Sequence, residues 1–210
     1  AEAHNNLGVA FKEINQIHIS LESFRNAISI KSDFAEAHNN LGLVFSNLGQ
    51  ITESIDSFKL ALKFKPDYIY AYNNYGSALK KIGKFKDASE WYLKALSIDP
   101  NFFEAHNNLG NVFKYLKRHD ESLKSYKRTY DLKPDADYVL GNIVHAKLHL
   151  CSWIGLSSYL NEFPKKINNG EKIVDPFPLL AIIDNPELQQ KSSEVYINHK
   201  FPENFDLPKI

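Results

Sequence analysis

The chain has 210 residues, enough for one elongated repeat array or for one to two globular domains. Its 25 basic and 25 acidic side chains cancel, so the sequence has neither the positive field that favours nucleic acid nor an acidic tail. A single cysteine, Cys151, excludes a disulfide framework and fits a reducing compartment, so we expect a cytoplasmic protein. No apolar run approaches the roughly 20 residues that cross a bilayer, and no signal-peptide pattern opens the chain.

One six-residue pattern recurs at a constant spacing of 34 residues, and this period is that of tetratricopeptide repeats. It reads Ala-His-Asn-Asn-Leu-Gly, or Ala-Tyr-Asn-Asn-Tyr-Gly in the third copy, and begins at Ala3, Ala37, Ala71 and Ala105. We therefore divide residues 1–136 into four repeats, at 1–34, 35–68, 69–102 and 103–136.

Each repeat is predicted to contain two helices. Glycine at repeat position eight falls inside the first helix, where it costs about 1 kcal/mol relative to alanine. We expect the second helix of the same repeat to approach too closely there for a side chain. Apolar residues three and four apart give the first helix one face to bury, in the first copy Ala3, Leu7, Ala10, Phe11 and Ile14.

Turn residues mark the helix ends. Gly49 and Gly83 are predicted to end the first helix of their repeats in the left-handed conformation. Asn15 can take the same role in the first repeat, and Lys117, in the fourth, is less suited to it. Prolines end the second helix, because proline cannot continue it. The four copies resemble tetratricopeptide repeats at nearly every defining position, which implies an all-α, right-handed superhelix with a concave inner groove.

The first repeat has no covering helix before it. With Ala1 already inside a repeat and no methionine present, we interpret the sequence as a piece cut from a longer protein. Leu7 and Phe11 would leave apolar surface in water, at roughly 25 cal/mol per Å². We therefore predict self-association through residues 1–34.

Residues 137–200 are predicted to form a helical cap and connector, and residues 201–210 a linker tail. The last helix should start at Asn185, an N-cap followed by proline, and run to about His199. Before it we expect helices at 138–153 and 154–168, the second limited or kinked by Pro164, then an extended stretch at 172–178 and a short helix at 179–183.

Histidines are the first candidates for chemistry. His4, His38 and His106 share one repeat position, but stacked helices lie roughly 8–10 Å apart and zinc needs nitrogen ligands about 2 Å away, so we interpret them as packing residues. His145 and His149 are four apart on a helix, yet no carboxylate or cysteine at zinc-site spacing accompanies them. No metal site and no cofactor is therefore expected, and no catalytic motif or phosphate-binding loop occurs.

Asparagine pairs at repeat positions five and six are the candidate binding site. Asparagine is a mediocre helix former, and stacked amides would offer a donor and an acceptor per rung to the backbone of an extended peptide. The alternative is that position six is partly structural, as in many such repeats. The pairs are Asn5 and Asn6, Asn39 and Asn40, Asn73 and Asn74, Asn107 and Asn108.

Two stretches after the repeats give a more specific resemblance. Residues 141–147 with 150–153, and residues 174–180 with 184–189, are similar to the segment that joins repeats to catalytic lobes in O-linked N-acetylglucosamine transferases and their SPINDLY-type relatives. That resemblance implies the protein-binding repeats of a glycosyltransferase whose catalytic domain is not in this chain. By position, only Asn6, Asn40, Asn74 and Asn108 transfer from the family, as a ladder that holds acceptor polypeptides for serine or threonine glycosylation.

The rival reading is a non-enzymatic scaffold or co-chaperone adaptor that binds acidic peptide termini. Such a clamp needs lysines facing the groove, and Lys80, Lys81 and Lys114 supply a partial set. Position five, however, carries asparagine throughout. In both readings the partner is a protein or peptide, and neither nucleic acid nor membrane is expected as a partner.

Overall fold

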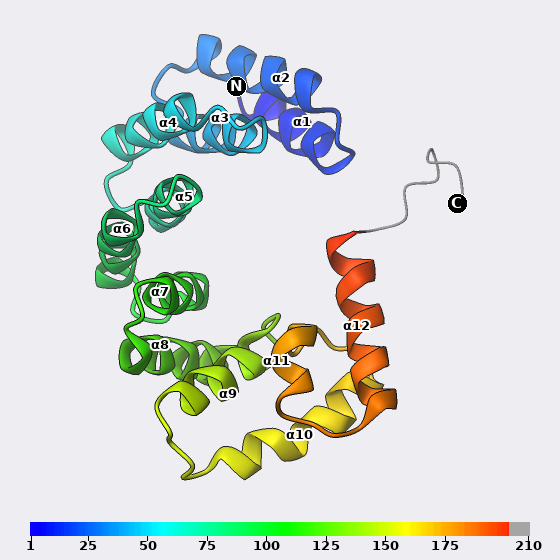
Figure 1. Cartoon of the computed structure of the whole chain (residues 1–210). Coiled ribbons are helices and arrows are strands. Elements are labelled where there is room, and N and C mark those ends of the chain that lie inside the picture. Colours follow the sequence, from blue (N-terminus) through cyan, green and yellow to red (C-terminus); the bar gives the residue numbers. More distant parts are fainter. Residues whose placement is uncertain (202–210) are drawn as a thin grey trace. The chain divides into compact units, whose positions relative to one another are not determined.

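A computed structural model describes residues 1–201 (Figure 1). Within this range the chain forms twelve helices and no strand, so the predicted all-α class is confirmed. None of these helices has the length and apolar character needed to span a membrane. The chain divides into two compact units, Ala1–Leu116 and the part from Lys117 onward, which are described separately below.

The first unit alternates two kinds of helix. In the first three repeats the first helix packs against the second helix of its own repeat and contacts the first helix of the next repeat. In Figure 1 the first helices lie along the inner side of this curved unit and the second helices along its outer side. The first helices are α1 (Glu2–Glu13), α3 (Ala35–Asn47), α5 (Ile69–Lys81) and α7 (Phe103–Tyr115), and the second helices are α2 (Ile17–Ile30), α4 (Ile51–Phe64) and α6 (Phe85–Ile98).

The glycine at position eight lies where the two helices of a repeat touch. A Cβ atom placed on Gly42 would be 2.6 Å from a ring carbon of Phe58, which is fully buried on α4. The same contact would be 2.6 Å at Gly8, against Phe24. The predicted close approach of the second helix is therefore confirmed, and an aromatic ring fills the space.

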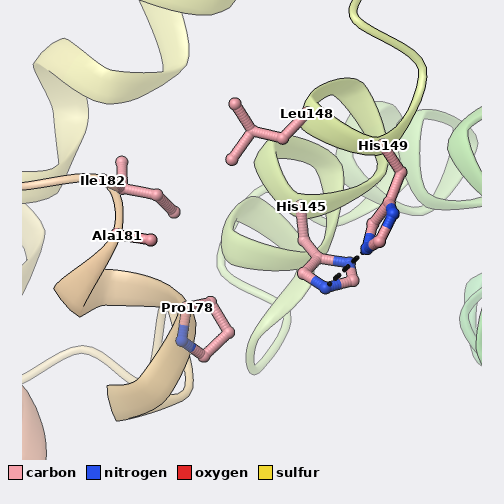
Figure 2. A pocket seen from close by; sticks show the side chains of 6 residues that line it. All are labelled: His145, Leu148, His149, Pro178, Ala181 and Ile182. Carbon is pink, nitrogen blue, oxygen red and sulfur yellow. Dashed lines mark hydrogen bonds between the residues drawn. The ribbon is translucent and has the colours of Figure 1, made fainter.

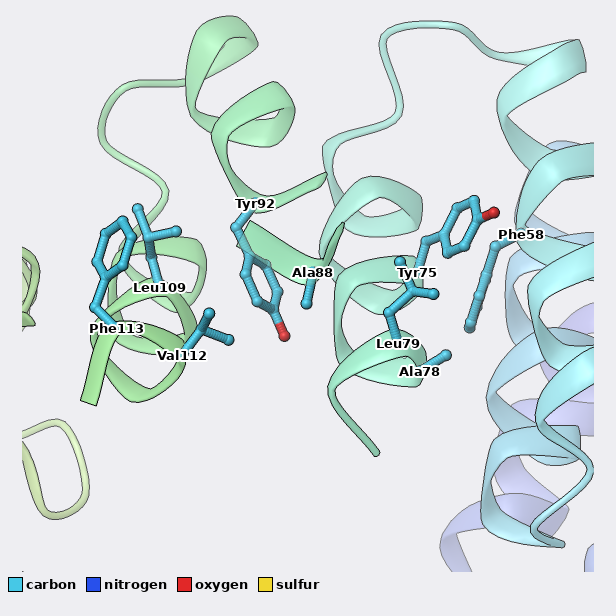
Figure 3. Close-up of a cluster of buried hydrophobic side chains, with 9 residues drawn as sticks. All are labelled: Phe58, Tyr75, Ala78, Leu79, Ala88, Tyr92, Leu109, Val112 and Phe113. Atoms are coloured by element: carbon cyan, nitrogen blue, oxygen red, sulfur yellow. The ribbon is translucent and has the colours of Figure 1, made fainter. Parts of the chain in front are cut away.

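The core of the first unit runs between successive repeats. Tyr75 on α5 stacks on Trp91 of α6, with ring centroids 4.0 Å apart. The cluster combines large aromatic rings with alanine and aliphatic side chains from successive repeats. Figure 3 shows the nine buried residues of this cluster: Phe58, Tyr75, Ala78, Leu79, Ala88, Tyr92, Leu109, Val112 and Phe113.

Turns after the first helices take the predicted left-handed conformation. Gly49 and Gly83 have φ of 76° and 75°. Asn15 and Lys117 occupy the equivalent positions with φ of 59° and 57°. Lys117 thus adopts the conformation even though its side chain makes it a poorer choice than glycine.

The second unit begins with α8 (His119–Leu132) and continues with α9 (Val139–His149), α10 (Leu156–Asn168), α11 (Pro176–Leu180) and α12 (Pro186–Lys200). The predicted N-cap is present, because Asn185 Oδ1 accepts a hydrogen bond from the backbone of Leu188 at 3.1 Å. Phe201 is the last described residue, and the rest of the predicted tail lies outside the described range.

Three predicted boundaries in this unit are wrong. The helix expected at 138–153 ends at His149, and Cys151 follows with a positive φ of 49°. The short helix expected at 179–183 instead begins at Pro176, because a proline at the first helical position has the φ that a helix needs. Consequently the extended stretch stops at Asp175. Pro164 lies inside α10, which continues through it.

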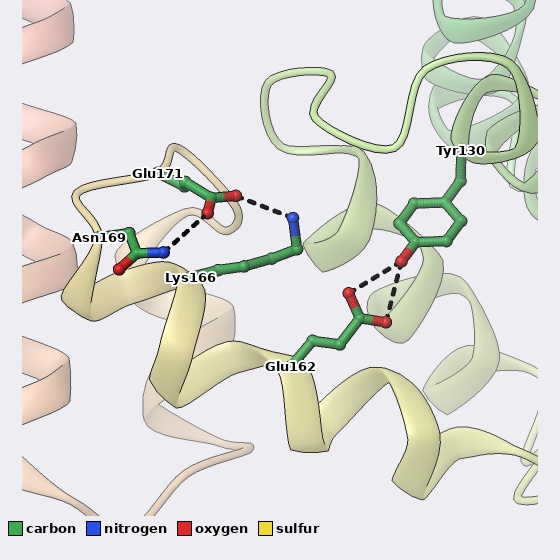
Figure 4. Close-up of polar contacts among 5 residues, drawn as sticks. All are labelled: Tyr130, Glu162, Lys166, Asn169 and Glu171. Carbon is green, nitrogen blue, oxygen red and sulfur yellow. Dashed lines mark hydrogen bonds and ion pairs between the residues drawn. The ribbon is translucent and has the colours of Figure 1, made fainter.

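Backbone and side-chain contacts tie the second unit together. The extended stretch meets α9 where the backbone of Gly141 donates to the carbonyl of Ile173 at 2.8 Å. Tyr130 donates to the carboxylate of Glu162 at 2.8 and 2.9 Å, and Lys166 pairs with Glu171 at 2.8 Å (Figure 4). Burial first, and then the Glu162 carboxylate, raises the pKa of Tyr130 to about 12.

Candidate peptide-binding site

The asparagines at positions five and six form a chain of hydrogen bonds between repeats. In three successive places the position-six amide donates through Nδ2 to the position-five oxygen of the preceding repeat, each at 2.9 Å. We call this set of side chains the asparagine column. Its bonds join Asn40 to Asn5, Asn74 to Asn39, and Asn108 to Asn73.

The two positions differ in exposure. Asn39, at position five, is 4% exposed, whereas Asn40 beside it is partly exposed. Asn6, at position six of the first repeat, is exposed. Position five is thus the more buried of the two in the first and second repeats, whereas both positions are partly exposed in the third and fourth repeats. Sequence reasoning predicted the column but not the pairing within it; the adjacent asparagines in every copy were its only sequence signal.

Pairing uses only part of each amide's capacity. A side-chain amide has two N–H donors and an oxygen that accepts twice. After Asn74 donates once to Asn39, it still has a second N–H and its own oxygen for another partner. This amide therefore keeps hydrogen-bonding capacity while its bond within the column stays intact.

The lysines of the clamp hypothesis are already engaged within the chain. Lys80 Nζ donates to Asn108 Oδ1 at 3.2 Å, so it lies beside the asparagine column. Burial, followed by the neighbouring charge of Lys81, lowers the pKa of Lys80. Lys81 Nζ donates to the backbone oxygen and Oγ of Ser46 at 3.0 and 2.8 Å. Lys114 lies half-buried on α7.

Side chains at position four hold successive repeats together. His38 Nε2 donates to the carbonyl of Ser32 at 2.9 Å, and His106 Nε2 donates to that of Pro100 at 3.0 Å. Tyr72 makes the corresponding bond to Pro66 at 3.1 Å. Each bond reaches the end of the preceding repeat, which gives these residues a packing role in the described structure.

No group of three or more histidine, cysteine, aspartate or glutamate side chains within residues 1–201 is arranged to hold a metal ion. Peptide binding through amides needs none. The chemistry that the asparagine column offers is hydrogen bonding without charge.

Family comparison covers most of the repeat region. One tetratricopeptide-repeat model matches residues 1–34 and 103–135, and a second matches residues 35–68. A further tetratricopeptide model matches residues 76–117. These residues are tetratricopeptide repeats. No curated protein matches the chain by sequence.

Solved tetratricopeptide structures share the fold at low identity. PilF of Pseudomonas aeruginosa has a TM-score of 0.77 and 17% identity, over 97% of this chain and 92% of that one. MamA has a TM-score of 0.67 and 18% identity, over 77% and 95%. YrrB, described as a tetratricopeptide protein with an unusual peptide-binding site, has a TM-score of 0.60 and 16% identity, over 91% and 90%. At such identities the likeness shows the tetratricopeptide fold alone.

Proposed function

We propose that the repeats bind an extended polypeptide along the asparagine column. The observation that carries this proposal is the repeated pairing of Asn40, Asn74 and Asn108 with the preceding repeats. The pairing fixes each amide in place before a partner arrives, which lowers the entropic cost of binding. YrrB, which shares the fold, is described as having a peptide-binding site.

Backbone recognition is the mode that suits this column. Packed helices lie roughly 8–10 Å apart, and an extended chain advances about 3.3–3.6 Å per residue. Successive rungs would therefore meet the partner near every third residue. Amides of this kind recognise N–H and C=O groups, so the site would accept many sequences.

We further propose that this array serves a SPINDLY-type protein glycosyltransferase and holds acceptor polypeptides for a separate catalytic domain. This finer proposal rests on the resemblance of residues 141–147 with 150–153, and of residues 174–180 with 184–189, to the connector of that family. The tetratricopeptide matches are equally consistent with a scaffold that has no transferase. Sequencing the parent gene past Ile210 separates the two, because a following nucleotide-sugar domain would favour the transferase.

Substitution of the position-six asparagines tests peptide binding. Replacing one of these asparagines by alanine should weaken binding by about 0.5–1.5 kcal/mol, the net value of one hydrogen bond. Replacing all four should weaken the binding of many unrelated peptides together. Fluorescence anisotropy with a panel of extended peptides measures this binding. The four are Asn6, Asn40, Asn74 and Asn108.

Asn26→Ala and Asn47→Ala are matched controls, because both asparagines are exposed on helices and lie outside the column. Thermal unfolding of every variant separates binding from stability. Column variants that bind normally but unfold more easily would contradict the proposal and leave the column a structural feature.

Lysine variants measured in the same assay test the clamp alternative. A clamp predicts lost binding in Lys80→Ala, Lys81→Ala and Lys114→Ala, a preference for acidic peptides, and strong weakening by salt. The amide column predicts little change between two salt concentrations, because its hydrogen bonds carry no net charge.

A further inference from the structure

Three histidines of the second unit meet although they come from two helices. His145 and His149 lie one turn apart on α9, and their Nε2 atoms are 3.3 Å apart. His119 on α8 stacks on His149 with ring centroids 4.5 Å apart and an interplanar angle of 3°. Figure 2 shows the rings of His145 and His149 turned toward each other at the edge of a pocket.

We propose that His145 and His149 form a binding site for a divalent transition-metal ion of the zinc class. Zinc lies about 2.0–2.1 Å from imidazole nitrogens in a tetrahedral arrangement, which places two such nitrogens roughly 3.3–3.4 Å apart. The observed Nε2 separation of 3.3 Å equals this value. In the structure the two Nε2 atoms share a hydrogen bond. Coordination therefore requires this bond to open and both neutral rings to turn an Nε2 lone pair toward a common point.

The surroundings pre-order one ligand and leave room for the ion. The parallel stack on His119 restricts the orientation of the His149 ring. His149 is exposed and His145 half-buried, so an ion has access from solvent. The adjoining pocket has a volume of about 240 Å³ and is lined by His145, Leu148, His149, Pro178, Ala181 and Ile182 (Figure 2).

Two protein ligands leave two of the four tetrahedral positions open. Since no third histidine, cysteine or carboxylate completes a metal group among the described residues, water or a donor from outside the chain fills them. Imidazole suits zinc, copper and nickel, and divalent copper binds such ligands more tightly than zinc does. The sequence alone predicted no metal at this pair; the separation of the two Nε2 atoms and the adjoining pocket change that expectation.

Isothermal titration of the full chain with zinc chloride tests the site. We expect saturable binding of one ion per chain and a melting temperature that rises with zinc concentration, because the ion binds only the folded form. His145→Gln and His149→Gln should each abolish saturable binding. His18→Gln, which removes an exposed histidine of α2, should bind as the parent does.

Absence of saturable binding by the parent chain overturns the proposal, as does unchanged binding in both variants. Circular dichroism without metal shows whether each variant is folded. If a variant fails to fold, zinc-edge X-ray absorption of the loaded parent decides the question instead. Two imidazole ligands per ion are expected there, and a spectrum without imidazole scattering refutes the site.

Discussion

Glycine at repeat position eight shows how one residue determines the distance between two helices. In a helix interior this residue costs about 1 kcal/mol relative to alanine. The structure shows why alanine is not better here. The Cβ atom of an alanine at position 42 would lie 2.6 Å from the Phe58 ring. Phe58 is fully buried, so relieving this contact requires its ring to shift within the core.

Gly42→Ala should therefore destabilise the protein by about 1 kcal/mol or more, since overpacking costs typically 1–3 kcal/mol and exceeds the gain in helix propensity. Urea unfolding measures the change. Asn47→Ala, at the exposed end of the same helix, is the control and should be close to neutral.

The variant Gly42→Ala with Phe58→Leu should lose less stability than the sum of the two single changes, because the smaller side chain relieves the clash. A Gly42→Ala variant as stable as the parent would contradict the prediction.

Single residues also show where sequence reasoning stops. Helical period and proline positions predicted the repeat helices, because these signals are local. The pairing of Asn74 with Asn39 joins residues 35 apart, and only packed helices reveal it. The sequence also offered no reason for the glycine at Gly141. A Cβ atom there would lie 2.7 Å from the carbonyl of Ile173, which is more than 30 residues away in the chain.

At the scale of elements, a buried hydrogen bond joins the two helices of a repeat. Ser54 Oγ on α4 donates to the carbonyl of Gly42 on α3 at 2.8 Å, and Ser20 makes the same bond to Gly8 at 2.7 Å. The third repeat has Ala88 at this position, so it lacks the hydroxyl. The chain thus contains repeats with and without this serine hydroxyl, which can be compared directly.

Ser54→Ala should cost about 0.5–1.5 kcal/mol, the net value of one hydrogen bond, in urea unfolding. Ala88→Ser places a hydroxyl over the equivalent carbonyl of Gly76 and should recover part of that amount in the third repeat. If both variants lose stability equally, side-chain volume rather than the hydrogen bond governs this position.

Helix boundaries in the second unit were harder to predict than those of the repeats. In the repeats a spacing of 34 residues supplies four copies of each boundary. In α11 the only guides were Pro176 and Pro178, and an extended stretch and a helix start both tolerate proline. The start of α11 at Pro176 therefore required the structure.

At the scale of the molecule, an apolar face remains on the first repeat. Leu7 is 45% exposed, whereas Tyr75, at the same position of the third repeat, is 8% exposed. We predict that the chain self-associates through residues 1–34, with a mass that rises with concentration in light scattering.

Leu7→Lys should shift this association toward the monomer. Leu60→Lys, which changes an exposed leucine of α4, is the control and should not. A single monomer mass at high concentration would show that the exposed face does not drive association.

The chain should also show no transferase or hydrolase turnover with any sugar nucleotide. Its sequence has no nucleophile motif and no phosphate-binding glycine loop. Product formation is measured by mass spectrometry with the purified chain and donor sugars. Turnover that disappears on mutation of this chain would mean that the chemistry resides here and not in a separate domain.

The three bonds of the asparagine column all run the same way, from a donor in the later repeat to an acceptor in the earlier one. The column therefore has a direction, and its two ends are not equivalent. A polypeptide backbone also has a direction. A bound polypeptide would therefore lie along this face in one preferred orientation, with its amino end toward a defined end of the repeat array, whatever its sequence.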